Sequence, residues 1–145
     1  MPKSIRSPIS SYRDLDAWHL AMDIVVQIYD LTRAFPAEEK FGLVAQLRRA
    51  AVSIPSNIAE GHSRLGAAEL RRFVSIARGS VSEVETQIAV SVALGFIGAD
   101  EITQLSSELA RLSKILFGLS SVVPKRPSAG RRLNSTGNIP PFLKV

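Results

Sequence analysis

Apolar residues recur at steps of three and four along four stretches of the chain, the spacing that places them on one side of an α-helix. The first stretch predicts a helix over about residues 14–34, with Asp14 and Asp16 at its start, where the helix dipole favours negative charge. It should end before Pro36, because the residue preceding a proline is disfavoured in helical conformation. Its predicted core stripe comprises Leu15, Trp18, Met22, Val25, Tyr29 and Phe35.

The second stretch opens with Glu38 and Glu39 and ends near residues 61–66. Its stripe passes through Pro55, although a proline deletes a backbone hydrogen bond and costs a helix interior about 3 kcal/mol. Two interpretations stay open. The unbroken phase on both sides favours one kinked helix, whereas Ser53 is also a suitable cap for a second, short helix. The stripe comprises Leu43, Leu47, Ala51, Ile54 and Ile58.

The third and fourth stretches predict long helices that pack at a shallow angle. The third covers residues 67–94, and a turn at residues 95–98 leads into the fourth, which Pro124 closes. Asp100 and Glu101 precede the fourth helix and Lys114 lies near its end, each sign matched to the dipole. The stripes comprise Leu70, Val74, Ala77, Val81, Val84, Ile88 and Ser91, then Ile102, Leu105, Leu109, Leu112, Leu116 and Leu119.

Four amphipathic helices with short connections, and no segment of strand period, predict an all-α, antiparallel up-down-up-down four-helix bundle. A length of 145 residues with 46% apolar content suits one domain, which we expect at residues 13–123. Residues 1–12 are expected to form a flexible N-terminal tail. Residues 124–145 are rich in Pro, Ser, Gly, Asn and basic residues, a composition typical of a disordered basic tail.

Cysteine is absent, which excludes disulfides and thiolate chemistry and fits a reducing cytoplasm. The first dozen residues lack the apolar core of a secretory signal, and no stretch reaches the roughly 20 apolar residues of a membrane span. We therefore expect a soluble, cytoplasmic protein without membrane contact.

The net charge of +5 is concentrated at the two ends of the chain. Residues 1–12 carry +2 and residues 124–145 carry +5, whereas residues 13–123 hold 11 basic and 13 acidic side chains. The expected bundle is therefore slightly acidic, and the tails supply the positive charge that attracts nucleic acid.

No set of residues points to catalysis. His19 and His62 lack the Glu-x-x-His pairing of a di-metal bundle, and phosphate loops, nucleophile elbows and dinucleotide fingerprints are absent. We expect neither an enzyme nor a metal site, a cofactor or a small-molecule substrate. Trp18 and Phe73 lie on apolar stripes and are most simply core residues.

Between residues 46 and 83, arginine is used throughout in place of lysine, which favours planar, multidentate hydrogen bonding. In one hypothesis the arginines pair with Glu60, Glu69 and Glu83 within or between subunits. In the other, unpaired arginines form a phosphate-binding face. The predicted nucleic-acid-binding residues are Arg48, Arg49, Arg64, Arg71, Arg72 and Arg78, with Lys125, Arg126, Arg131 and Arg132 in the tail, which is also consistent with a purely solvating role.

Small and polar residues interrupt two of the expected helices. Residues 53–61 are expected to pack closely against another helix, with serine and asparagine side chains satisfying the carbonyl groups that Pro55 frees. Gly79 lies inside the third helix, where it costs about 1 kcal/mol relative to alanine, so a close backbone approach is expected there, either within the bundle or between subunits. The predicted structural or interface residues are Asn57, Glu60, Gly79, Ser80 and Glu83.

A series of short motifs resembles the four-helix bundle family encoded in intervening sequences of bacterial 23S ribosomal RNA genes, which is also similar to the accessory variability determinant of diversity-generating retroelements. The resemblance covers about residues 12–120. It rests on Trp18, Phe35, Pro36, residues 41–43 (FGL), 46–50 (QLRRA), 53–54 (SI), 57–61 (NIAEG), Arg64, Phe73, residues 77–80 (ARGS), Glu83 and residues 94–96 (LGF).

The resemblance implies a four-helix protomer in a ring-like homo-oligomer, a pentamer in these relatives, without catalysis or cofactor. It also implies binding of nucleic acid or of a reverse transcriptase through basic surface, although the relatives are often more basic in the bundle. The family's polar motif positions fall on Arg49, Asn57, Glu60, Arg64, Arg78, Ser80 and Glu83.

Two functions follow as hypotheses. The first is a homo-oligomeric scaffold that binds RNA or a ribonucleoprotein partner through the arginines and the basic tail. The alternative is a protein-protein adaptor whose arginines serve subunit contacts.

Overall fold

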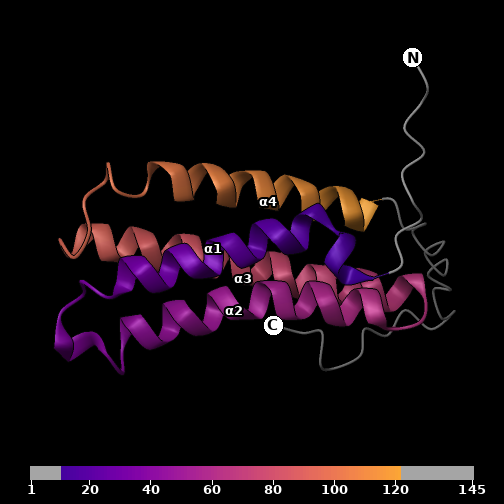
Figure 1. Cartoon of the computed structure of the whole chain (residues 1–145), viewed down its shortest axis with the longest axis horizontal. Coiled ribbons are helices and arrows are strands. Elements are labelled where there is room, and N and C mark those ends of the chain that lie inside the picture. The colour runs from indigo at the N-terminus through magenta and orange to yellow at the C-terminus, as the bar shows by residue number, and fades with distance from the viewer. Residues whose placement is uncertain (1–10, 122–145) are drawn as a thin grey trace, which may run out of the picture.

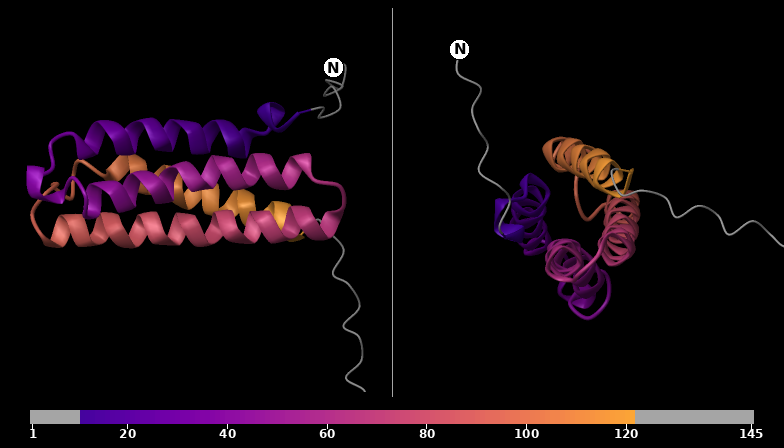
Figure 2. Two further views of the ribbon diagram at one scale, coloured as in Figure 1. Left: turned by 90° about the horizontal axis from the view of Figure 1, so that it is seen from below. Right: turned by 90° about the vertical axis from the view of Figure 1, so that its right-hand side faces the viewer.

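The computed structural model describes residues 11–121, and within them four α-helices lie side by side along one axis (Figure 1). Each helix runs antiparallel to the one before it, and the view down the axis shows them arranged in a ring in which α4 returns to α1 (Figure 2). The predicted antiparallel four-helix bundle is confirmed. The elements are η1 (Tyr12–Asp14), α1 (Asp16–Thr32), η2 (Ala37–Glu39), α2 (Leu43–Ser63), α3 (Ala67–Ala93) and α4 (Thr103–Ser121).

The expected C-terminal tail lies outside the described residues, as do residues 1–10 and 122–123. Ser11 and Tyr12, which the expected N-terminal tail includes, belong to the first turn of the structure. Ser11 caps η1, its Oγ accepting from the amide of Arg13 at 3.3 Å, while Asp14 accepts from the amide of Ser11 at 3.1 Å. Tyr12 packs edge-on against Trp18, with ring centroids 5.4 Å apart. These contacts order the chain before α1 begins.

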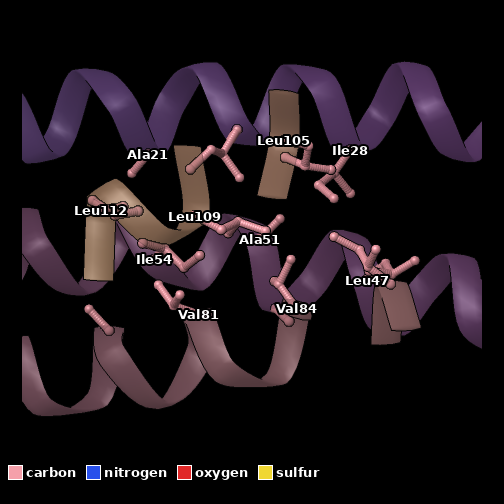
Figure 3. Packing of buried hydrophobic residues seen from close by; sticks show 14 of the residues in the cluster. Ala21, Ile28, Leu47, Ala51, Ile54, Val81, Val84, Leu105, Leu109 and Leu112 are labelled. Carbon is pink, nitrogen blue, oxygen red and sulfur yellow. The ribbon is translucent and has the colours of Figure 1, made fainter. Parts of the chain in front are cut away.

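The bundle core is built from the stripes predicted for α2, α3 and α4. Ile54, Val84 and Leu112 are fully buried, and Figure 3 shows side chains from the four helices converging on one another. In α3 the stripe is buried from Val74 to Ser91 at every predicted position. The burial of these aliphatic side chains means that packing against neighbouring helices stabilises each helix more than its intrinsic helix propensity does.

The predicted stripe of α1 was wrong for Met22 and Tyr29, whereas Phe35, just beyond the helix, is buried as predicted and Leu15, Trp18 and Val25 pack against the core. The core face of α1 comprises Ala17, Leu20, Ala21, Ile24 and Ile28, whereas Met22 and Tyr29 are 38% exposed and Trp18 and Val25 are half-buried. This helix has apolar residues on two faces, so the spacing of apolar residues in the sequence does not decide which face packs into the core. The small side chains of Ala17 and Ala21 permit the close packing, which leaves the larger stripe on the flank.

The start of α2 differs from the prediction. Glu38 and Glu39 form the separate turn η2, and α2 begins at Leu43. The carboxylate of Glu39 accepts a hydrogen bond from the Leu43 amide at 3.1 Å, so it satisfies one of the unpaired amides at the helix N-terminus.

Helix α2 continues without interruption through Pro55, so the single-helix interpretation is confirmed and Ser53 does not cap a second helix. The expected satisfaction of freed carbonyls was wrong in detail. Pro55 removes the donor to the carbonyl of Ala51, four residues earlier. The nearby polar side chains instead reach the carbonyls on either side of it: Ser53 to Ala50, Ser56 to Val52 and Asn57 to Ser53.

Two glycines with positive φ connect the later helices. Gly66 (φ 100°) joins α2 to α3, and Gly95 (φ 77°) ends α3. At the second turn the amide of Phe96 donates to the Ser91 carbonyl and that of Gly95 to the Val92 carbonyl, the pair of bonds of a Schellman motif. Among residues 11–121, no helix has the length and apolar character needed to span a bilayer.

Candidate binding surface on helices α2 and α3

A groove of about 460 Å³ runs between α2 and α3 on the outside of the bundle. It brings together four of the predicted binding or interface residues, namely Arg49 and Asn57 from α2 with Ser80 and Glu83 from α3. Ile76 also lines the groove and was missed, although an isoleucine off the core stripe of α3 is a signal that could have identified it. The remaining lining residues are Gln46, Ala50 and Ser53.

The floor of the groove is a chain of polar contacts. The hydroxyls of Ser53 and Ser80 lie 2.5 Å apart, and Ser53 Oγ also lies 2.8 Å from the carbonyl oxygen of Ala50. Asn57 Nδ2 donates to the Ser53 carbonyl at 2.7 Å. Because Ser80 is buried, this hydroxyl pair ties the two helices together at a position where an unpaired polar group would be costly.

Two opposite charges line the same groove without internal partners. Within the described part of the chain, neither Arg49 nor Glu83 makes a hydrogen bond or an ion pair, and both side chains are exposed. The expected pairing of an arginine with Glu83 is therefore not found there. Both groups are free to contact a molecule that enters the groove.

Most of the other predicted arginines contact their own chain. Arg48 Nε donates to Thr32 Oγ1 at 2.9 Å, and its guanidinium stacks over Tyr29 at 4.4 Å from the ring centroid. Arg78 lies over Phe117 at 5.1 Å. Such stacking spreads the guanidinium over an apolar surface and holds it in one orientation.

At the turn between α2 and α3, arginines and glutamates form a surface network. Arg64 pairs with Glu60 at 2.8 Å and with Glu69 at 3.7 Å, and Arg72 also reaches Glu69 at 3.7 Å. Both guanidinium groups lie over the ring of Phe73. The hydrogen bond to Glu60 raises the pKa of Arg64 above its ordinary value, helped by the negative charges of Glu60 and Glu69, while burial lowers it. Because the pairs are exposed, they orient these groups more than they stabilise the fold.

Of the two glycines in this helix pair, Gly79 differs from the expectation, whereas Gly61 lies in the segment for which close helix packing was predicted. A Cβ on Gly79 would meet nothing within 4 Å, so residues 11–121 make no close backbone approach there. The close approach lies instead at Gly61, where a Cβ would stand 2.8 Å from Cβ of Phe73. The helix-helix spacing thus depends on Gly61, and Gly79 leaves a bare strip of backbone on the exposed face of α3.

The antiparallel arrangement separates charge between the two ends of the bundle. The half with the α2–α3 turn, residues 11–24, 53–80 and 112–121, holds six basic and five acidic side chains. The opposite half, residues 25–52 and 81–111, holds five basic and eight acidic ones. The start of η1 and the end of α4 both lie in the first half (Figure 2). From there the sequence continues into the basic residues of positions 1–10 and 122–145.

Metal chemistry has no evident location in this part of the molecule. Across residues 11–121, no three histidine, aspartate or glutamate side chains are grouped so that they could hold a metal ion. Nε2 of His19 lies 2.6 Å from the carbonyl oxygen of Arg13, a local contact at the start of α1. The predicted tail residues Lys125, Arg126, Arg131 and Arg132 lie outside the described region.

These features define an all-α protein of the four-helix bundle class, with a polar groove on one helix pair. Residues 13–118 match the profile of the 23S rRNA-intervening sequence protein family, and the chain belongs to that family. The fold is similar to the crystal structure of a protein with unknown function from the S23 ribosomal protein family of Bacteroides thetaiotaomicron VPI-5482. The TM-score is 0.67 and the identity 18%, over 72% of this chain and 97% of the other. No curated protein matches the chain.

Proposed function

We propose that the protein is a non-catalytic, cytoplasmic scaffold that assembles into a homo-oligomer, a pentamer by its family resemblance, and binds RNA or a ribonucleoprotein partner at the basic end of the bundle. The observation that carries this proposal is the separation of charge between the two ends. The less acidic half of the bundle is also the half where both terminal segments, which together carry +7, join it.

Arginines with outward orientation support a phosphate contact at this end. Arg64 and Arg72 are held by carboxylates and by the Phe73 ring, yet about half or more of each side chain remains exposed. A guanidinium fixed in this way keeps free N–H donors for a phosphate group and loses less entropy on binding. Arg48 is excluded from the proposed surface because its Nε is engaged by Thr32 in the opposite half.

The proposal can be tested by fluorescence anisotropy with a labelled single-stranded RNA and a labelled RNA hairpin over a range of salt concentrations. Phosphate contacts make the logarithm of affinity fall linearly with the logarithm of salt, with a slope of about −0.7 per contact for single strands. Replacing Arg131 and Arg132 with glutamine removes two charges, so the slope should become shallower by about 1.4 if both contact phosphate.

Matched controls come from the opposite end of the bundle. Replacing Arg33 and Lys40 with glutamine removes the same charge from exposed positions near the α1–α2 connection. These control variants should bind RNA with an unchanged salt slope. Equal weakening by both pairs, or no binding of either RNA at low salt, would refute a localised RNA site.

The adaptor function is a second candidate, favoured by the groove between α2 and α3. Arg49 and Glu83 have no ion-pair partner among residues 11–121, and the neighbouring Gly79 exposes backbone, features that suit contact with another protein surface. If these groups pair between copies, Arg49→Glu and Glu83→Arg should each lower the mass measured by light scattering. The double variant should restore it. An assembly that persists in both single variants would remove the groove from the subunit interface.

A further inference from the structure

A second groove lies on the other side of α2, against the flank of α1 that carries Trp18, Met22 and Val25. It has a volume of about 340 Å³ and is lined mainly by apolar side chains: Tyr12, Trp18, Met22 and Val25 with Val52 and Pro55 of α2. Met22 and Val52 remain 38% and 40% exposed. The bundle therefore leaves a continuous apolar strip without a partner in the described part of the chain.

The end of the groove near η1 has an aromatic wall. The rings of Tyr12 and Trp18 meet edge to face, with centroids 5.4 Å apart and planes inclined at 60°. Aromatic-lined grooves of this kind bind proline-rich segments, because a polyproline II helix is extended and already formed, so it loses little conformational entropy on binding. The chemistry of the wall thus points to an extended, proline-containing ligand.

The charge around the groove restricts the ligand further. Between its first and last residues α1 contains Asp16, Asp23 and Asp30, all exposed, and no lysine or arginine. Two arginines also lie over aromatic rings on this flank, Arg13 over Tyr12 at 5.9 Å and Arg48 over Tyr29 at 4.4 Å, so the surrounding charge is mixed and favours a mainly apolar segment of low charge.

The chain itself contains such a segment. Residues 139–145 read Ile-Pro-Pro-Phe-Leu-Lys-Val. We propose that residues 139–145 dock in the α1–α2 groove of their own chain. The two prolines lie against the Tyr12 and Trp18 wall, and Phe142 and Leu143 occupy the apolar strip between Met22 and Val52.

Chain length favours docking within one molecule. Residue 121, where the described chain ends, lies at the same end of the bundle as η1, and α4 packs beside α1 (Figure 1). Residues 122–138 form a 17-residue connection, and a coil of that length has an end-to-end distance of about 20–25 Å. Neighbouring helix axes are about 10 Å apart, so the connection reaches the groove at an effective concentration of about 1 mM.

Trp18 provides the measurement, since it is the single tryptophan of the chain and lies in the groove. In the full-length protein, acrylamide quenching of Trp18 fluorescence reports whether the groove is covered. Replacing Phe142 and Leu143 with serine should raise the quenching constant about twofold, because a segment with Kd of about 100 µM would otherwise occupy about nine-tenths of the grooves. Circular dichroism verifies that the bundle is unchanged.

Leu133→Ser is the matched control, an apolar residue of the same terminal region outside the proposed segment. It should leave quenching unchanged. A synthetic peptide of residues 136–145 should restore protection to the Phe142→Ser, Leu143→Ser variant, and a scrambled peptide should not. Equal quenching of the wild type and this variant would overturn the proposal, as would equal loss of protection in Leu133→Ser.

Dilution tests whether the segment comes from the same chain. Protection that persists over about a hundredfold dilution supports intramolecular docking, because the effective concentration does not depend on protein concentration. Protection that disappears on dilution would overturn it and assign the segment to a second copy. No RNA enters these measurements, so their outcome is independent of the proposed function.

Discussion

Two glycines in one helix pair should respond in opposite directions to the same substitution. Gly61 lies in α2 against α3, where an added Cβ would stand 2.8 Å from Cβ of Phe73 and 3.5 Å from the carbonyl oxygen of Leu70. Gly79 lies in α3, where an added Cβ would meet nothing within 4 Å. Replacement by alanine therefore adds a methyl group to a tight helix-helix contact at Gly61 and to open space at Gly79.

The expected magnitudes follow from this geometry. In an exposed helix interior, alanine is favoured over glycine by about 1 kcal/mol, so Gly79→Ala should stabilise the bundle by up to that amount. At Gly61 the same gain is outweighed, because Cβ of Phe73 is fixed to the backbone and no rotamer change relieves the contact. Overpacking of this kind costs about 1–3 kcal/mol and more when helices must separate, so we expect net destabilisation of about 1–2 kcal/mol.

Thermal unfolding followed by circular dichroism measures both effects. For a domain of this size, 1 kcal/mol corresponds to a shift in Tm of about 4 °C. Gly79→Ala should raise Tm by up to about 4 °C, and Gly61→Ala should lower it by about 4–8 °C. The Gly61→Ala effect should not depend on protein concentration, because the contact is internal to the chain. A Gly61→Ala variant as stable as the wild type would refute the described α2–α3 spacing.

Three further predictions concern packing. Leu112→Ala should lower the free energy of unfolding by about 2–5 kcal/mol, because Leu112 is fully buried, and a loss below about 1 kcal/mol in urea denaturation would contradict its core position. Arg48→Lys should lower the free energy of unfolding nearly as much as Arg48→Ala, because a lysine does not reproduce the guanidinium stacked over Tyr29. An Arg48→Lys variant as stable as the wild type would contradict this role of the guanidinium. Ser80→Ala should cost about 1 kcal/mol through the lost Ser53 contact, with no further loss in the double variant Ser53→Ala, Ser80→Ala, and additive losses would show that the hydroxyls act independently.

The sequence was sufficient to predict the helices and most of the core. The stripes of α3 and α4 were predicted because each of these helices has one apolar face, and the spacing of three and four residues then decides which side is buried. The turn that ends α3 was similarly predicted from residues 95–98, and Gly95 has the positive φ of such a turn. The family relationship also followed from short motifs, and the profile match over residues 13–118 confirmed it.

The candidate site was predicted only as a set of residues. Arg49, Asn57, Ser80 and Glu83 were named, but their meeting in one groove depends on the register between α2 and α3. The number of residues between two positions does not show which residues of α2 lie opposite which residues of α3.

What the sequence determined by itself is local: which residues share a helical face, where helices end, and where charge lies along the chain. What only the tertiary structure decided is which of two apolar faces of α1 packs inward, which glycine permits a close approach, and which arginines are engaged. The physical reason is that helical periodicity follows from bonds between near neighbours. The buried face of a helix, the distance between helices and the side chains that pair depend instead on how closely two helices approach, which small residues such as Ala17 and Gly61 permit. These are properties of a pair of helices and not of one helix alone.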